Sequence, residues 1–251
     1  MILLKSAREI ELIKAASKIV SETIKDLIGY IRPGLSTEQI NQRAKALIAK
    51  QGGQPAFLGY QGFPAAVCVS INNEVVHGIP GLRQLKKGDI VSLDIGVKLN
   101  GYFGDAAITL PVGKISKEAE NLISVTRGAL VKGIEQATSG NRLSNLSCTI
   151  QQFVEENGFS VVRQFVGHGI GSRLHEEPAV PNFGIMNQGP ELLSGTVLAI
   201  EPMVTQGDYR VEVAQDGWTV VTRDGSLSAH FEDTVAVTDN SPEVLTGIST
   251  L

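Results

Sequence analysis

The stretch GDIVSLDIGVKLNGYFGD, residues 88–105, decides the fold because it places two strand patterns around one turn. Asn100-Gly101 is the strongest short-range signal for a two-residue β-hairpin turn of type I′. The flanking segments 90–97 and 103–110 are rich in β-branched and apolar side chains, which is typical of strands. The sequence therefore predicts a long antiparallel hairpin at this point.

A type I′ turn fixes which residues face each other across the hairpin. Leu99 stands opposite Tyr102 and Gly96 opposite Asp105, so Asp94 lies diagonal to Asp105 on the same face. Diagonal positions are about 7–8 Å apart, within reach of two carboxylates that share a metal pair. We expect Gly96 to leave room for the ion or the substrate. The alternative is two exposed strand acids, but their convergence on one face of an apolar hairpin favours the metal.

A second segment, GTVLAIE at residues 195–201, repeats the pattern of GDIVSLD at residues 88–94. Each has a glycine, an apolar strand and an acid, and each is followed by a strand with a second acid, Asp105 or Glu232. A chance match is the alternative, because strand patterns are frequent. We interpret the chain as a single domain, residues 1–251, with two related halves at about 1–140 and 141–251.

Helical patterns precede both acidic segments. Ser6-Ala7-Arg8-Glu9 is a capping box, and apolar residues at helical spacing follow it until Pro33-Gly34. Further helices are predicted at about 36–51, 116–136 and 144–157. Further strands are predicted at 67–71, 197–204, 209–213, 219–222 and 231–237. This order of helices and strands predicts an α+β fold with mainly antiparallel sheet.

The composition narrows the class of protein. The chain has 251 residues and a net charge of −4, with no dense run of Lys and Arg, which argues against a nucleic-acid binder. Cys68 and Cys148 lie far apart and form no metal-binding motif or disulfide framework, so we expect a reducing, cytoplasmic location. The apolar start Ile2-Leu3-Leu4 is too short for a signal peptide, and we expect no membrane span.

Five side chains with hard donor atoms lie in predicted strands or at loop positions near them. They are Asp94, Asp105, His168, Glu201 and Glu232. Four carboxylates and one imidazole are typical of a two-metal hydrolytic centre, which makes water nucleophilic at neutral pH. The absence of thiolates among them favours Mn, Fe, Co or Zn in a catalytic site over a structural zinc site.

Three of the four histidines lie in loops rich in glycine or proline, where functional residues concentrate. His168 stands within Gly-His-Gly-Ile-Gly, whose glycines let another group approach the ring closely. His175 follows seven residues later, and His77 precedes Gly-Ile-Pro. The fourth, His230, shares a strand face with Glu232, and we interpret it as an ordinary strand residue rather than a partner of the site.

Together these motifs resemble the type I methionine aminopeptidases. The resemblance rests on Asp94, Asp105, Gly-His168-Gly-Ile-Gly, Ala-Ile-Glu201-Pro-Met and Ser-Ala-His-Phe-Glu232. It runs from the first helices to about Asp239 and is closest to the short bacterial or organellar form. It implies the pita-bread (creatinase/aminopeptidase-like) fold, in which two pseudo-symmetric halves with antiparallel sheet and flanking helices surround a dinuclear metal site.

The resemblance also implies the chemistry. It is that of a metalloaminopeptidase, which removes the N-terminal methionine from nascent proteins when the second residue is small, through a metal-bridged hydroxide. The five residues would hold two divalent ions of Co, Mn, Fe(II) or Zn, with Asp105 and Glu232 bridging both. His77, His175 and Glu201 would be catalytic. His175 would donate to the scissile carbonyl, His77 would contact the next amide, and Glu201 would relay a proton.

The resemblance places the methionine side chain in an apolar pocket beside His77 and His175. The pocket residues would be Tyr60, Phe63, Cys68 and Trp218, with Phe57 and Leu174 beside them. Phe57 stands where some relatives have a cysteine, and Leu174 replaces an aromatic residue found in others. The alternative for each is an ordinary core residue, which composition alone would favour.

Two other functions remain open from the sequence. A proline-specific aminopeptidase or dipeptidase of the same fold usually carries an added N-terminal domain and extra histidines. A non-catalytic peptide-binding protein of this fold would have lost metal ligands, and all five are present here. We expect nascent polypeptide N-termini as partners of a monomer that binds neither nucleic acid nor membrane directly, and docking on the ribosome is left open.

Overall fold

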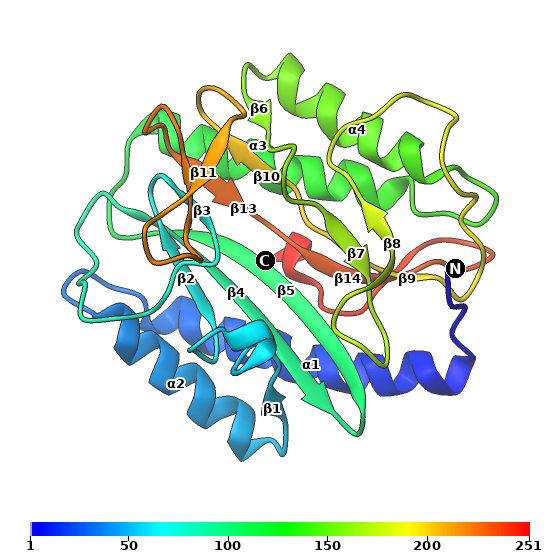
Figure 1. The fold of residues 1–251 in the computed structure, drawn as a ribbon, viewed down its shortest axis with the longest axis horizontal. Coiled ribbons are helices and arrows are strands. Elements are labelled where there is room, and N and C mark those ends of the chain that lie inside the picture. Colours follow the sequence, from blue (N-terminus) through cyan, green and yellow to red (C-terminus); the bar gives the residue numbers. More distant parts are fainter. Residues whose placement is uncertain (1) are drawn as a thin grey trace.

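The computed structural model describes residues 2–251 and places helices on both sides of a layer of antiparallel strands (Figure 1). The helices of these residues are α1 (Ala7–Tyr30), α2 (Thr37–Lys50), α3 (Lys117–Glu135) and α4 (Leu143–Glu156), with the 3-10 turns η1 (Tyr60–Gly62) and η2 (Ile248–Thr250). In Figure 1, α1 and α2 lie below the strands, and α3 and α4 lie above them. The predicted helices and the α+β class are thus confirmed.

The strands of the described residues form four small sheets, in which every pairing is antiparallel. One sheet contains β1 (Gln54–Pro55), β2 (Cys68–Ile71), β4 (Ile90–Leu99) and β5 (Tyr102–Pro111). The largest contains β7 (Gly167–Gly169), β8 (Glu176–Val180), β9 (Val197–Ile200), β14 (Asp233–Ala236) and β15 (Glu243–Val244). The other two contain β6 (Ser160–Val161), β10 (Met203–Thr205) and β13 (Ser228–His230), and β3 (Glu74–Val76), β11 (Val211–Val213) and β12 (Val220–Thr222).

The hairpin of β4 and β5 has the predicted register. Gly96 pairs with Asp105, and Leu99 pairs with Tyr102. Asn100 and Gly101 both have positive φ angles, 50° and 87°, as a type I′ turn requires. Helix α1 packs along this hairpin and buries its apolar stripe there.

Two predicted strands are interrupted at acidic residues. The predicted strand 197–204 divides into β9 and β10 around Glu201-Pro202, because proline has no N–H to donate to a strand ladder. The predicted strand 231–237 begins only at Asp233, and β13 ends before it at His230. Glu201 and Glu232 therefore lie at breaks between strands, where their side chains can turn towards a common centre.

A line of hydrogen bonds joins the two main sheets across the middle of the molecule. Three residues of β5 each exchange hydrogen bonds with one residue of the segment 230–234: Asp105 with Thr234, Ala107 with Glu232, and Thr109 with His230. The Glu232 N–H donates to the Ala107 carbonyl at 2.9 Å, and the hydroxyls of Thr109 and Thr234 complete the other two pairs. We call this line the seam; it places β5 beside the segment that carries Glu232.

The repeated acidic segments have the same local structure. Gly88 and Gly195 have φ angles of 99° and 91°, which glycine adopts without strain. The N–H of each donates at 3.0 Å to the carbonyl just beyond the paired strand, Val112 in one case and Val237 in the other. Two related units would share these backbone features, whereas a chance similarity of sequence would not be expected to produce them.

The helix pairs before these segments also correspond. Gly34 follows α1 and donates to the Leu85 carbonyl, and Gly140 follows α3 and donates to the Leu192 carbonyl, both at 2.8 Å. Each unit therefore contains two helices followed by the glycine-led strand. We propose that the two units meet at residues 112–116, between β5 and α3, which moves the junction from the position near residue 140 that the sequence suggested.

Gly104 permits the close packing of β5 on α1, and replacing it tests that packing. A Cβ at Gly104 would lie 2.6 Å from the backbone nitrogen of Ser17. We expect Gly104→Ala to lower the free energy of unfolding by about 1–3 kcal/mol, as overpacked substitutions do. Gly29→Ala, in open space at the end of α1, should raise it by about 0.5–1 kcal/mol. Urea denaturation measures both, and equal stabilities of the two variants would contradict this packing.

Candidate metal centre and active site

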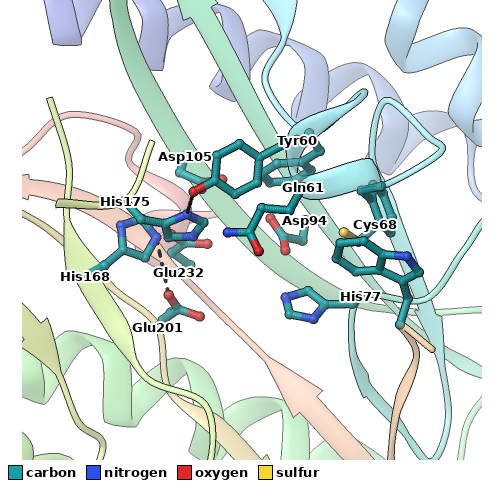
Figure 2. A pocket seen from close by; sticks show the side chains of 13 residues that line it. Tyr60, Gln61, Cys68, His77, Asp94, Asp105, His168, His175, Glu201 and Glu232 are labelled. Carbon is teal, nitrogen blue, oxygen red and sulfur yellow. Dashed lines mark hydrogen bonds and ion pairs between the residues drawn. The ribbon is translucent and has the colours of Figure 1, made fainter. Parts of the chain in front are cut away.

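A single cavity of about 160 Å³ gathers nearly all the residues that the sequence singled out (Figure 2). Its lining residues are Phe57, Tyr60, Gln61, Phe63, Cys68, His77, Asp94, Asp105, His168, His175, Glu201, Trp218 and Glu232. Figure 2 shows the carboxylates pointing into a common space, with His168 and His175 on one side and His77 on the other. The cavity thus has an acidic floor and a largely aromatic wall.

The five acidic and imidazole groups reach the floor from five separate segments. Asp94 and Asp105 come from β4 and β5, His168 comes from β7, and Glu201 and Glu232 come from the strand breaks. One donor atom each of Asp105, His168 and Glu232 lies within 4.8 Å of the other two, a spacing at which one metal ion can bind all three. The hairpin register adds Asp94 as a diagonal neighbour of Asp105.

The carboxylates are buried without partners that would offset their charge. Asp94 Oδ1, Asp105 Oδ1 and Glu232 Oε1 are all buried and accept no hydrogen bond from the described residues. Burial raises the pKa of Asp94 to about 7 and that of Glu201 to about 8. Burial, and then neighbouring carboxylates, hold the pKa values of Asp105 and Glu232 well above their ordinary range. Oxygen donors left unpaired in this way fit a divalent cation, whose charge would offset theirs.

The hydrogen bonding of His168 leaves one ring nitrogen free to bind a metal. Its Nδ1 lies 2.9 Å from the carbonyl oxygen of Gly169, so we assign the proton to Nδ1. Nε2 then keeps its lone pair and lies 3.6 Å from Glu201 Oε1. Burial lowers the pKa of His168 to about 3, so the ring is neutral at pH 7.

We assign the opposite tautomer to His175. Its ring lies 4.2 Å from that of His168, centroid to centroid, and the Tyr60 hydroxyl lies 2.7 Å from its Nδ1 (Figure 2). With the phenol donating, Nδ1 accepts and Nε2 carries the proton. Burial lowers the pKa of His175, which keeps the ring neutral. His175 can therefore donate a hydrogen bond from Nε2 into the cavity.

His77 is held in a sparsely populated conformation across the cavity. Its φ is 60°, in the left-handed region that costs energy for any residue with a Cβ. Its ring packs edge-on against Phe165 and Trp218, with centroid distances of 5.7 and 6.4 Å. Burial lowers the pKa of His77 to about 4, so this ring is also neutral at pH 7. A conformation held against its own strain is a feature of functional positions.

The aromatic wall corrects one expectation from the sequence, that Gly96 leaves room for an ion or a substrate. A Cβ at Gly96 would lie 2.6 Å from the ring of Phe57, so Gly96 makes room for that ring and not for an ion or a substrate. Leu174 does not line the cavity; it is buried in the hydrophobic cluster that contains Phe57, Phe63 and Cys68. Both details depend on the path of the loop at residues 56–63, which the sequence pattern did not define.

One residue that lines the cavity and one that contacts its acidic floor from behind were missed from the sequence. Gln61 lines the cavity from a turn in which its own φ is 49°, and no sequence pattern marks it. His230 was interpreted as an ordinary strand residue, but its Nε2 lies 3.6 Å from Glu201 Oε2 and neither ring nitrogen has a hydrogen-bond partner among the described residues. Its position two residues before Glu232 was the signal that could have identified it.

The profile of metallopeptidase family M24 matches residues 11–239 of the chain. The chain belongs to metallopeptidase family M24. A methionine aminopeptidase of Clostridium perfringens is 56% identical over 246 residues, 98% of this chain and 99% of that protein. Methionine aminopeptidase 1 of Bacillus subtilis is 51% identical, over 99% of this chain and 100% of that protein. The family match and these two relatives confirm the resemblance to type I methionine aminopeptidases that the motifs indicated.

Solved structures of M24 peptidases have the same fold. The crystal structure of a methionine aminopeptidase from Thermotoga maritima matches with a TM-score of 0.97 at 45% identity, covering 98% of this chain and 99% of that one. A prolidase from Pyrococcus furiosus matches with a TM-score of 0.80 at 23% identity, covering 97% of this chain and 65% of that one. The second match shows the fold alone. No helix among residues 2–251 is both long and apolar enough to span a bilayer.

The acidic floor predicts opposite effects of Asp105→Asn on the metal-free and metal-loaded protein. Without metal, the substitution removes one of several repelling buried carboxylates, so we expect an unchanged or higher melting temperature. With Mn²⁺ at a hundredfold excess over its Kd, the unchanged chain should gain about 2.7 kcal/mol, and the variant should lose most of that gain. Thermal unfolding with EDTA or Mn²⁺ measures both.

Asp239→Asn is the control for this experiment, because Asp239 is exposed near the end of the chain. This variant should keep the full stabilisation by Mn²⁺. A metal-induced stabilisation that survives in Asp105→Asn would remove Asp105 from the ligand set.

Proposed function

We propose that this M24 metallopeptidase removes the N-terminal methionine from newly made polypeptides whose second residue is small. The observation that carries the proposal is a buried floor of carboxylates with unpaired oxygens beside an aromatic wall in one cavity. Relatives named methionine aminopeptidases, at 51–56% identity over nearly the full chain, support it.

We propose that two divalent cations bind at the floor, held by Asp94, Asp105, His168, Glu201 and Glu232. Carboxylate and imidazole donors without thiolate suit Mn, Fe(II), Co or Zn. Such ions supply a Lewis acid for the scissile carbonyl and make water more acidic. The chain's own contribution is to fix the donors before the ions arrive, through the seam for Asp105 and Glu232 and through Gly169 for His168.

The histidines act on the substrate in this proposal. His175 would donate from Nε2 to the scissile carbonyl oxygen as negative charge develops there, which is the role of an oxyanion-hole donor. His77, neutral and fixed between two aromatic rings, would contact the next amide on the opposite side. Glu201, with a raised pKa, is suited to accept a proton from the attacking water and return it to the leaving amine.

The aromatic wall would bind the methionine side chain. Tyr60, Phe63, Cys68 and Trp218 line the cavity, and Phe63 and Trp218 meet edge to face with ring centroids 5.2 Å apart. Burying an apolar side chain of this size is worth about 1.5–3 kcal/mol, and the unbranched thioether adapts to an irregular wall. Phe57 narrows this wall relative to a cysteine, and Leu174 supports it from behind.

The alternatives from the sequence are less favoured. The prolidases and Xaa-Pro peptidases that share the fold are 22–23% identical to this chain, which supports the architecture but no common substrate. A non-catalytic protein has no need to keep four buried carboxylates whose charge opposes folding. We also propose that the enzyme acts as a monomer in the cytoplasm on the N-termini of nascent chains. Both of its cysteines are free and buried, which is compatible with a reducing compartment.

Hydrolysis of two peptides tests the substrate. With Mn²⁺ or anaerobic Fe²⁺ present, we expect release of methionine from Met-Ala-Ser and little hydrolysis of an Xaa-Pro dipeptide. A Met-Leu-Ser peptide is the matched control for the second residue and should be cleaved much more slowly. Faster hydrolysis of the Xaa-Pro dipeptide would overturn the proposal.

His175→Ala tests the assigned donor. We expect kcat for Met-Ala-Ser to fall by about 10²–10³, the range for losing one oxyanion-hole donor, with metal content unchanged. Tyr60→Phe keeps the aromatic wall but removes the hydroxyl that fixes the tautomer of His175, so its kcat should fall less. Metal content by elemental analysis accompanies both, and an unchanged kcat in His175→Ala would exclude His175 from the chemistry.

A further inference from the structure

A buried ion pair lies outside the cavity, directly behind the turn that carries His175. Lys5 Nζ and Glu176 Oε2 are 2.6 Å apart, and their side chains are 5% and 1% exposed. Among the lysine and arginine ion pairs of residues 2–251, this is the only one in which both side chains are that deeply buried. A buried pair is costly to desolvate and is therefore a weak source of stability, which leaves its purpose to be explained.

The second oxygen of Glu176 closes the turn between β7 and β8. Glu176 Oε1 accepts a hydrogen bond from the Arg173 N–H at 3.0 Å and lies 3.4 Å from the Ser172 hydroxyl. Gly171 is required for this approach, because a Cβ there would lie 2.5 Å from Lys5 Cε and 2.8 Å from Glu176 Oε1. The Glu176 carboxylate therefore links the turn at residues 171–175 to the Lys5 ammonium group.

Lys5 is itself fixed to the rigid part of the fold. Its N–H donates to the Gly195 carbonyl at 2.7 Å, and the Gly195 N–H donates to the Val237 carbonyl at 3.0 Å. Its ammonium group also donates to the Leu3 carbonyl at 2.8 Å. Gly195 immediately precedes the segment that leads into β9, the strand that Glu201 directly follows. Lys5 thus connects the turn that carries His175 to the segment that leads through β9 to Glu201.

The backbone position of His175 is set by this turn. It directly precedes Glu176, and its ring contacts the Tyr60 hydroxyl and the ring of His168. Burial raises the pKa of Glu176, but the Lys5 ammonium and the Arg173 N–H lower it more, so the carboxylate is ionised at neutral pH. Without the ammonium, a buried carboxylate has no counter-charge and must move or take up a proton, and either change releases the turn.

We infer that Lys5 is a positioning residue for His175, acting through Glu176 and the turn at residues 171–175. The inference rests on the proposed role of His175 as a donor to the scissile carbonyl. A shift of about 1 Å in a catalytic group can cost on the order of 10²-fold in rate, so a remote lysine can have a large effect on turnover.

Lys5→Met is the first test, since methionine keeps the length of the side chain and removes its charge. We expect kcat for Met-Ala-Ser to fall at least about tenfold, with KM and bound metal unchanged. Lys25→Met, at an exposed lysine of α1, should behave like the unchanged chain. Gly128→Ala, where a Cβ would lie 2.8 Å from the ring of Phe153 between α3 and α4, controls for lowered stability and should keep its kcat at 25 °C. If Lys5→Met does not fold, Glu176→Gln, which keeps the size of the side chain, takes its place.

A double-mutant cycle with His175→Ala decides whether Lys5 acts through His175. In the His175→Ala background, adding Lys5→Met should change kcat by less than about twofold, because the group that it positions is absent. The same tenfold fall in both backgrounds, or an unchanged kcat in Lys5→Met alone, would overturn the inference. An unaffected His175→Ala variant would overturn the proposed role of His175 and this inference with it. If His175→Ala lowers kcat and Lys5→Met does not, only the role of Lys5 is overturned.

Discussion

The seam between β5 and the segment 230–234 is the constraint on which the cavity depends. In the seam, Ala107 pairs with Glu232, two residues along β5 from Asp105. This pairing places the Glu232 carboxylate close to that of Asp105. Two threonine hydroxyls replace ladder bonds where the strands separate. Because these contacts join segments more than 120 residues apart, the acids can meet only when both units are folded and paired.

The seam brings buried carboxylates together, and their mutual repulsion opposes folding. Buried carboxylates raise one another's pKa values, and the apolar core has to stabilise the fold against that repulsion until cations bind. The histidines add no positive charge, because burial keeps them neutral. In the proposed mechanism their tautomers would divide two tasks. The bond to Gly169 would leave His168 with a lone pair for a metal, and a bond donated by Tyr60 would leave His175 with a proton for the substrate.

The predictable features are those specified within a short stretch of sequence. Asn100-Gly101 defined the hairpin register, and the capping box at Ser6 defined the start of α1. Some features that depend on distant contacts were missed or wrong. The space beside Gly96 is filled by a ring from another loop, and His230 meets Glu201 only after the sheets pair. Short strands such as β7 are likewise held by their neighbours and not by their own composition.

The number of acids constrains both the ions and the recognition of the substrate. Asp94, Asp105, Glu201 and Glu232 would together carry four negative charges, which two divalent cations balance and one does not. With a single ion, the raised pKa values of the acids mean that protons would occupy part of the floor. A floor neutralised by two ions has no net attraction for the ammonium group of a peptide. In the proposed enzyme, selection of methionine would then come from the aromatic wall. A substitution at Phe57 would alter substrate choice without changing the number of charges on the floor.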